Sequence, residues 1–406
     1  MKKSFFILLS LAVLASLAGA AYLFAPARIK GRLGFSAEPS RTSPEASARS
    51  LEDQLVIFHE SRIANQPKDA QAHRLLARAL LERGKVTGDP VDFDRAWAEL
   101  DRSEALEPHD LRTLTERADL SLSRHRFGLG RALAEQGLQR APDDIDLLGL
   151  AGDGAVEMGD IAGAETYYRE RARLGPTLPS SWVKLARSAE IQGRLEEAAV
   201  LMQDALDKAY VRRISQDGIA WIAARCAEIA MKRGKLDDAR RFLDTALQLK
   251  PEHPLALEFL ANLELWQGHP QAAEVAYRKL LSLRPRSPKI QLRLANLLAA
   301  GGKSDEAQRL KDESLRLFEQ SVASGFEGYL RDLATLDLAA GRYQRAAELA
   351  ARDLTLRPTV ESRALYAGIL QAAKDAGHTL TNSAPHESQD IHATSRSPVA
   401  VLSRQQ

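Results

Sequence analysis

The sequence contains a single cysteine, Cys226, among its 406 residues. One thiol cannot form an intrachain disulfide or supply a multi-cysteine metal site. Cys226 precedes the small residue Ala227 at an expected core-facing position, so we expect a buried structural thiol. A strong charge of one sign is also missing, because 56 basic residues are matched by 54 acidic ones. This balance argues against a nucleic-acid-binding protein, which needs positive charge to displace counterions.

Motifs for catalysis and cofactor binding are missing as well. The chain has no glycine-rich phosphate loop, no HExxH sequence and no paired-cysteine motif. Asp143 and Asp144 follow Pro142 at an expected helix start, where acidic side chains cap free backbone amides, so we interpret them as caps rather than metal ligands. We therefore expect a non-enzymatic protein with no metal and no cofactor.

The first residues have the composition of an export or membrane signal. Lys2 and Lys3 precede an uncharged, mostly apolar run at residues 5–25. The small residues at 18–20 fit a cleavage site that would release a soluble exported protein. The run is also long enough to span a bilayer, and this length favours an uncleaved anchor. Residues 1–27 are thus predicted to be a signal peptide or a transmembrane anchor.

The charges on the two sides of this apolar segment favour opposite orientations in a membrane. Lys2 and Lys3 favour a cytoplasmic N-terminus, whereas Arg28, Lys30 and Arg32 oppose export of the chain that follows. We expect the body to face the periplasm or the extracytoplasmic side, either anchored or released. Residues 28–49, rich in Ser, Pro and Ala, are expected to be a flexible linker. The polar residues 377–406 are expected to form a disordered tail.

Prolines that end apolar helical runs recur at a fixed spacing between these segments. The gaps from Pro108 to Pro142, from Pro142 to Pro176 and from Pro251 to Pro285 are each 34 residues. The other gaps equal one or two such periods plus five or seven residues, which indicates three short insertions. Internal repetition at this spacing is typical of a helical repeat protein.

A second pattern lies inside each period. The middle of seven of the eight units carries a glycine, and His125 takes this place in the remaining unit: Gly84, Gly159, Gly193, Gly234, Gly268, Gly302 and Gly341. A small residue precedes this position by seven residues in all eight units, and another follows it by five in seven of them. Glycine ends a helix in a left-handed turn, and small residues let two helices approach closely. Each unit is therefore predicted to be a pair of antiparallel helices, and the first insertion is expected to form a loop at 85–94.

This pattern resembles the tetratricopeptide repeat family, whose unit is a 34-residue helix–turn–helix with small residues at these positions, an aromatic residue in the second helix and a closing proline. The resemblance covers residues 50–376 and implies an all-α, right-handed solenoid of about eight units behind an N-terminal signal or anchor helix. The segment 51–63 is expected to be a capping helix, and the units are placed near 70–110, 111–144, 145–178, 179–212, 220–253, 254–287, 288–321 and 327–360. The unit at 288–321 departs from the pattern, since Lys311 stands in place of the aromatic residue and Glu319 in place of the proline.

The resemblance also implies a concave face, lined by the first helix of each unit, that commonly binds an extended peptide or a partner's helix. The residues that map there include Lys184, Arg187, Trp221, Arg225, Glu258, Asn262, Trp266, Arg293 and Asn296. The amides of Asn262 and Asn296, one period apart, can each pair with a peptide backbone, and the arginines can bind a carboxylate. The alternative is that Asn and Arg are ordinary polar residues of a solvated helix face, which is the base expectation. Trp221 follows an insertion, where it either anchors a partner or fills a gap.

We therefore expect a protein-interaction scaffold, anchored or exported, that binds a peptide or partner protein on its concave face in envelope assembly or biogenesis, without nucleic acid. The alternative is a structural subunit that self-associates, or joins a membrane complex, through its outer faces and ends.

Overall fold

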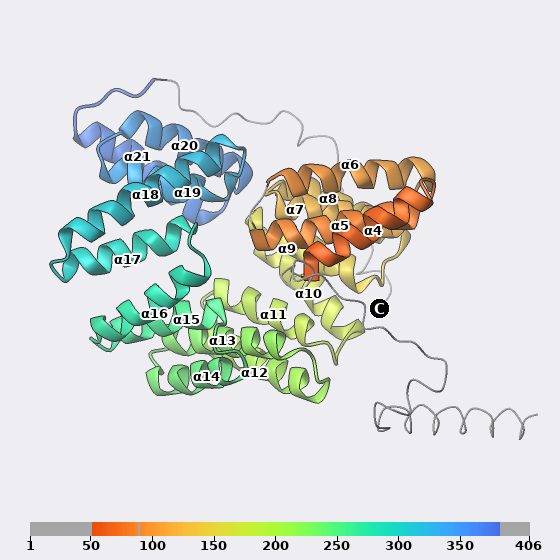
Figure 1. Cartoon of the computed structure of the whole chain (residues 1–406), viewed down its shortest axis with the longest axis horizontal. Coiled ribbons are helices and arrows are strands. Elements are labelled where there is room, and N and C mark those ends of the chain that lie inside the picture. Colours follow the sequence, from red (N-terminus) through yellow and green to blue (C-terminus); the bar gives the residue numbers. More distant parts are fainter. Residues whose placement is uncertain (1–50, 88–89, 382–406) are drawn as a thin grey trace, which may run out of the picture. The chain divides into compact units, whose positions relative to one another are not determined.

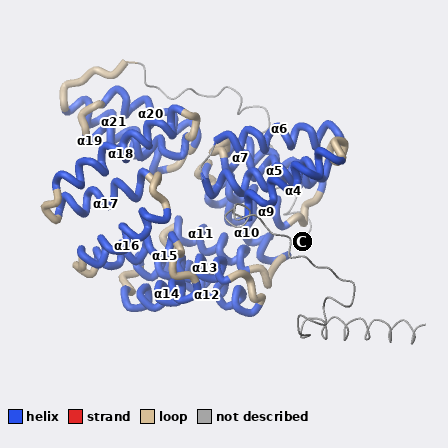
Figure 2. Tube along the Cα trace, viewed as in Figure 1, coloured by secondary structure: helices blue, strands red, loops and turns tan. Residues whose placement is uncertain are grey.

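In a computed structural model of the chain, residues 51–87 and 90–381 are described, and every regular element among them is a helix (Figure 2). The elements are α4 (Leu51–Asn65), α5 (Ala70–Thr87), α6 (Pro90–Leu106), α7 (Leu111–Ser123), α8 (Phe127–Arg140), α9 (Ile145–Glu157), α10 (Ile161–Leu174), α11 (Pro179–Ile191), α12 (Leu195–Val211), α13 (Gln216–Lys232), α14 (Leu236–Leu249), α15 (Pro254–Trp266), α16 (Pro270–Leu283), α17 (Pro288–Ala300), α18 (Ser304–Ala323), the 3-10 helix η1 (Glu327–Tyr329), α19 (Leu330–Ala339), α20 (Tyr343–Leu356) and α21 (Val360–Asp375).

The helices pack in consecutive pairs, and each pair packs on the next (Figure 1). Thus α13 contacts α14 within one unit, and α13 also contacts α15, the first helix of the following unit. These contacts confirm the predicted all-α solenoid for the described residues. Its core includes the small residues of the repeat and, in five of the second helices, one large buried residue: Leu100, Tyr168, Met202, Leu243 and Tyr277.

The turn between the two helices of a unit has the predicted left-handed conformation in most units. Six of the seven predicted glycines have φ between 71° and 79°: Gly159, Gly193, Gly234, Gly268, Gly302 and Gly341. At Gly268 the glycine N–H donates to the Leu265 carbonyl at 3.1 Å, and the His269 N–H donates to the Glu264 carbonyl at 2.8 Å. This pair of bonds satisfies carbonyls at the end of α15. His125 has φ 59° and makes the same kind of turn without glycine.

Gly84 does not make a turn, and the loop predicted at 85–94 is largely helical. Helix α5 continues through Gly84 to Thr87, and α6 begins at Pro90, a favourable residue for a first helical turn. The inserted residues therefore lengthen both helices of the unit. A Cβ atom at position 84 would lie 3.1 Å from Cζ of Phe93, a tight contact, so glycine here favours the close approach of α6.

The unit at 288–321, which has no closing proline, has a longer second helix, since α18 spans 20 residues where α16 spans 14. Nothing at Glu319 removes a backbone N–H or blocks the preceding turn, so the helix continues to Ala323. The five-residue insertion at 322–326 includes the end of α18, and η1 begins directly after it. The start of α9 agrees with the predicted cap, because Asp144 accepts hydrogen bonds from the Asp146 and Leu147 amides.

Several predicted segments fall outside the described residues: the signal or anchor at 1–27, the linker at 28–49 and most of the tail at 377–406. In the part of the chain that is described, no helix has both the length and the apolar character that crossing a membrane requires.

Two glycine substitutions test the conformational basis of the repeat. We expect Gly268→Ala to destabilise the protein by about 1 kcal/mol, because its φ of 78° brings an added Cβ too close to the backbone. Gly368→Ala, in the open interior of α21, is the matched control and should instead stabilise by roughly 0.5–1 kcal/mol. Urea unfolding followed by circular dichroism measures both, and equal effects of the two substitutions would contradict the assignment.

Candidate functional site

The first helices of three successive units border one pocket. It has a volume of about 370 Å³ and its lining residues come from α13, α15 and α17: Glu228, Met231, Lys232, Glu258, Phe259, Asn262, Leu265, Trp266 and Arg293. Four predicted groove residues, Glu258, Asn262, Trp266 and Arg293, therefore meet here. The remaining predicted residues, Lys184, Arg187, Trp221, Arg225 and Asn296, do not line this pocket.

The pocket has an apolar side that ends in an exposed aromatic ring. Trp266, the last residue of α15, is 58% exposed, and Leu265 beside it is 38% exposed. Phe259 and Met231, which also line the pocket, are buried. Trp266 follows Asn262 by four residues, which places both side chains on the same face of the helix. An exposed indole next to a pocket is a large surface that a ligand can cover with a gain in free energy.

The amide of Asn262 is oriented by a buried tyrosine. The Tyr277 hydroxyl donates to Oδ1 of Asn262 at 2.7 Å, and burial raises the pKa of Tyr277, so this hydroxyl stays protonated. The bond leaves the N–H groups of Asn262 as donors for another partner. The same contact occurs at the equivalent positions of an earlier unit, where the Tyr168 hydroxyl donates to Asp153 at 2.7 Å.

Asn296 occupies the same position one period after Asn262, but its surroundings differ. Residue 311, which corresponds to Tyr277, is a lysine, and Asn296 is exposed. The loss of the aromatic residue from the core of this unit thus removes the group that would orient the second amide. The two asparagines share a place in the repeat without sharing a chemical environment.

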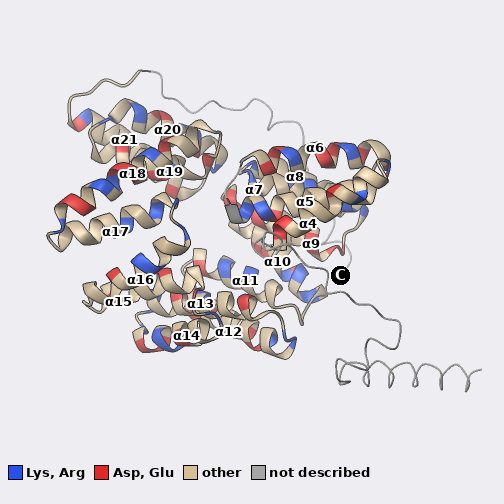
Figure 3. Cartoon of the chain, viewed as in Figure 1, with Lys and Arg blue, Asp and Glu red and all other residues tan. Residues whose placement is uncertain are grey.

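The basic residues of the groove are already paired with carboxylates of the same chain. Lys184 Nζ lies 2.5 Å from Asp153, Arg187 lies 3.3 Å from Glu157, and Arg225 lies 2.7 Å from Glu190. Arg293 pairs with Glu258 in the same way. In each case the carboxylate belongs to the preceding unit, so the pairs form a ladder across the first helices. Figure 3 shows basic and acidic residues interspersed on these helices. The arginines therefore have intrachain partners in place of the ligand carboxylate expected for them.

The ladder has no pair between α13 and α15 among the described residues. Lys232, near the end of α13, pairs within its own helix with Glu228 at 2.8 Å and with Glu190 of α11. The pocket lies at this interruption, so a ligand can reach its apolar side without breaking an ion pair between α13 and α15.

Two further predicted residues have defined surroundings. Trp221, in the first turns of α13, is 39% exposed. Cys226, on the same helix, is buried as predicted, and burial raises the pKa of its thiol to about 12. At neutral pH it is a thiol rather than a reactive thiolate.

The sequence pattern did not reveal Met231, Phe259 or Leu265 as pocket residues. A usable signal was present in α15, PLALEFLANLELW, which is apolar on nearly all sides. A helix of this kind has more apolar surface than one packed face can bury. Part of the apolar surface of α15, at Phe259 and Leu265, lines the pocket.

Comparison with known sequences gives a consistent family assignment. One sequence model of the tetratricopeptide repeat matches residues 264–320, and another matches residues 58–105, 150–210 and 227–288. Together these matches cover half of the chain. The structure of yeast Tom70 has a TM-score of 0.50 to this chain at 17% identity, over 69% of this chain and 60% of that one, which reflects a shared fold.

Two curated relatives are similar to parts of the sequence. Cellulose synthase operon protein C of Xanthomonas axonopodis pv. citri is 26% identical over 392 residues, covering 84% of this chain and 24% of that protein. Pre-mRNA-splicing factor SYF1 of Homo sapiens is 23% identical over 159 residues, covering 35% of this chain and 17% of that protein. The chain thus spans a quarter or less of the length of these relatives.

The ion-pair ladder is tested by neutralising one buried and one exposed carboxylate. Glu190, whose side chain is 7% exposed, accepts from both Arg225 and Lys232. We expect Glu190→Gln to destabilise the α11–α13 region by about 2 kcal/mol, because two cations lose a shared charged acceptor. Glu196→Gln is the control: its side chain is 80% exposed in a pair with Arg233, and such pairs contribute little.

Hydrogen exchange measured by mass spectrometry reports this loss locally, as faster exchange of amides in α11 and α13. Indistinguishable exchange in the two variants would show that the ladder does not couple these units.

Proposed function

Because the chain belongs to the tetratricopeptide repeat family, we propose that it is a protein-interaction scaffold that binds an extended segment of a partner protein along α13, α15 and α17. The observation that carries this proposal is the exposed Trp266 at the edge of the pocket shared by these helices. Indole side chains at the centre of a contact contribute a large share of the binding free energy.

The chemistry of the pocket restricts what this segment contains. Its apolar side fits a bulky aliphatic or aromatic side chain, and the volume of about 370 Å³ is at the small end for a ligand site. The N–H groups of Asn262 can donate to a backbone carbonyl of the segment. The cations of the groove are already neutralised by the ladder, so an acidic motif gains little here. We propose a partner segment with an apolar anchor residue and no cluster of acidic residues.

The cellular setting is proposed from the sequence and from one relative. The segment 1–27 has the features of an export signal or membrane anchor. Cellulose synthase operon protein C carries a name that points to polysaccharide synthesis, which supports a role in the assembly or biogenesis of the cell envelope. We propose that the body lies on the extracytoplasmic side, where it recruits its partner.

A second candidate function is self-association or assembly through the outer surface. Val200, Val211 and Val275, on the second helices α12 and α16, are 63%, 82% and 70% exposed. Covering such residues with a second copy would bury apolar area. The two functions differ in which surface is required, and substitutions in the groove separate them.

Peptides selected from a displayed random library against the full chain test the groove. We expect Trp266→Ala to weaken their binding by about tenfold or more, because an anchor ring is lost. Trp221→Ala is the matched control, an exposed tryptophan outside the pocket, and should leave affinity unchanged. The double substitution Asn262→Ala with Asn296→Ala should also weaken binding without a loss of helical content. Tyr277→Phe removes the hydroxyl that orients the Asn262 amide, so it should weaken binding as well, by less than the double substitution.

Peptides that bind all these variants equally would refute the groove assignment. A molar mass that rises with concentration in light scattering, indifferent to the groove substitutions, would favour self-association instead.

The N-terminal segment is tested separately. We expect the protein isolated from membranes to have the mass of the uncleaved chain and to resist extraction by salt, because an apolar anchor is held by the hydrophobic effect rather than by charge. A mass shortened by about the first 20 to 27 residues, together with recovery in the soluble fraction, would show that the segment is a cleaved signal.

A further inference from the structure

Two irregular positions of the repeat, far apart in the sequence, contact each other. His125 stands at the α7–α8 turn, where other units have glycine, and Phe326 belongs to the insertion between α18 and α19. Their ring centroids are 5.5 Å apart at an interplanar angle of 77°, an edge-to-face contact. The backbone also passes close by, since a Cβ atom on Gly328 would lie 2.7 Å from Nε2 of His125. A side chain at position 328 would therefore clash with the imidazole.

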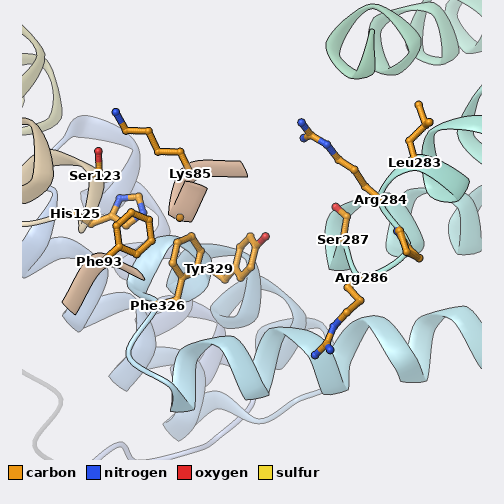
Figure 4. Close-up of a pocket in the computed structure, with 12 residues that line it drawn as sticks. Lys85, Phe93, Ser123, His125, Leu283, Arg284, Arg286, Ser287, Phe326 and Tyr329 are labelled. Carbon is orange, nitrogen blue, oxygen red and sulfur yellow. The ribbon is translucent and has the colours of Figure 1, made fainter. Parts of the chain in front are cut away.

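The aromatic contact extends into the core on both sides. The ring centroids of His125 and Phe127 are 5.4 Å apart, and those of Phe326 and Tyr329 are 4.9 Å apart. Tyr329 in turn packs on the buried Phe318 of α18 at 5.1 Å. Figure 4 shows His125, Phe326 and Tyr329 grouped together beside a pocket of about 570 Å³, with Arg284 and Arg286 on its opposite side.

A second contact joins the same two regions. The Arg357 guanidinium lies 6.0 Å from the ring centroid of Phe127, within the range of a cation–π interaction. Next to it, a Cβ atom on Gly159 would lie 3.0 Å from the Pro358 carbonyl oxygen. Residues at or beside the turns of the second and third units thus contact both ends of the last unit: Phe326 lies just before it, and Arg357 and Pro358 lie near its end.

A solenoid does not need such contacts, because each of its units is stabilised by its neighbours alone. The residues involved are the ones that depart from the repeat: a histidine at a glycine position and an insertion. His125 keeps its left-handed backbone, with φ 59°, at a cost that glycine would avoid. The contact of the imidazole ring with Phe326 offsets this backbone strain.

We propose that His125 and Phe326 form an intrachain clasp that joins the second unit to the segment before the last unit and limits how far the units between them can extend. The clasp does not depend on the proposed groove, because neither residue lines that pocket. It would set the curvature that the first helices present to any ligand.

The clasp is expected to be sensitive to acid. Burial lowers the pKa of His125 to about 4; Arg357 and Lys289 act in the same direction, and Asp353 opposes them. In an opened clasp the imidazole would return toward its ordinary pKa of 6.5. The open form therefore binds a proton more readily between these values. The clasp keeps its full stability above pH 6.5 and loses it progressively as the pH falls toward 4.

A pair of identical substitutions tests the clasp. His125→Gly removes the ring and relieves the left-handed strain. His109→Gly relieves the same strain at φ 65°, at an exposed residue outside the contact. If the only role of His125 were to form the turn between α7 and α8, both substitutions would leave the stability of the protein unchanged or raise it. We expect only His125→Gly to increase the radius of gyration in small-angle scattering and to speed hydrogen exchange at residues 326–330. The proposal would be overturned if His125→Gly left both the radius of gyration and the hydrogen exchange unchanged.

Cross-linking tests the contact without relying on the stability of a variant. In a Cys226→Ser background, His125→Cys with Phe326→Cys should form a disulfide under mild oxidation, detected by peptide mass mapping. His109→Cys with Phe326→Cys is the control and should remain reduced. Two accessible thiols at 125 and 326 that fail to cross-link would show that the clasp is absent.

Acid titration tests the role of the imidazole. Scattering of the wild-type chain should show expansion as the pH falls from 6.5 toward 4. His125→Asn keeps a residue that tolerates the left-handed region but cannot titrate, and should show a smaller expansion over this range. The same pH response in both proteins would overturn the role of His125.

Discussion

The body depends on one contact that every unit repeats, the approach of two helix backbones across small residues. Ala261 and Ala273 are the pair in the sixth unit, and both are fully buried. A larger side chain at either place would separate the helices, since close-packed interiors have no spare volume. Each pair is also the surface on which the next pair packs, so a change in one unit alters the direction of those that follow. In the third unit the approach is so close that even alanine would not fit, because a Cβ on Gly152 would lie 2.3 Å from the Tyr168 ring.

Much of this fold was predictable because the same residue types recur at the same positions in many units. Six turn glycines and the cap at Asp144 follow from residue type and position alone. Gly84 could not be interpreted correctly in the same way, because glycine serves both left-handed turns and close approaches. Only the position of the Phe93 ring against α5 distinguishes the two uses, and this position depends on packing. The length of α18, in contrast, follows from the absence of a proline at Glu319.

The candidate site was predictable as a set of positions but not as a set of interactions. Arg293 and Glu258 were placed on the same face, yet their pairing, which changes what the groove offers a ligand, became visible only in the structure. A sequence signal did exist, since each groove cation follows its carboxylate by about one period. The role of Tyr277 in orienting Asn262 was equally hidden, because it joins a core residue to a groove residue.

Repeat proteins ordinarily gain and lose whole units during evolution without harm, because each added unit needs only a neighbour on which to pack. The contacts of His125 with Phe326 and of Gly159 with Pro358 remove that freedom here. Duplication or deletion of a unit anywhere between them would shift one partner by a full repeat and leave two tight surfaces unmatched. The number of units between these contacts is therefore a fixed structural property, and lineages that keep the contacts should keep that number.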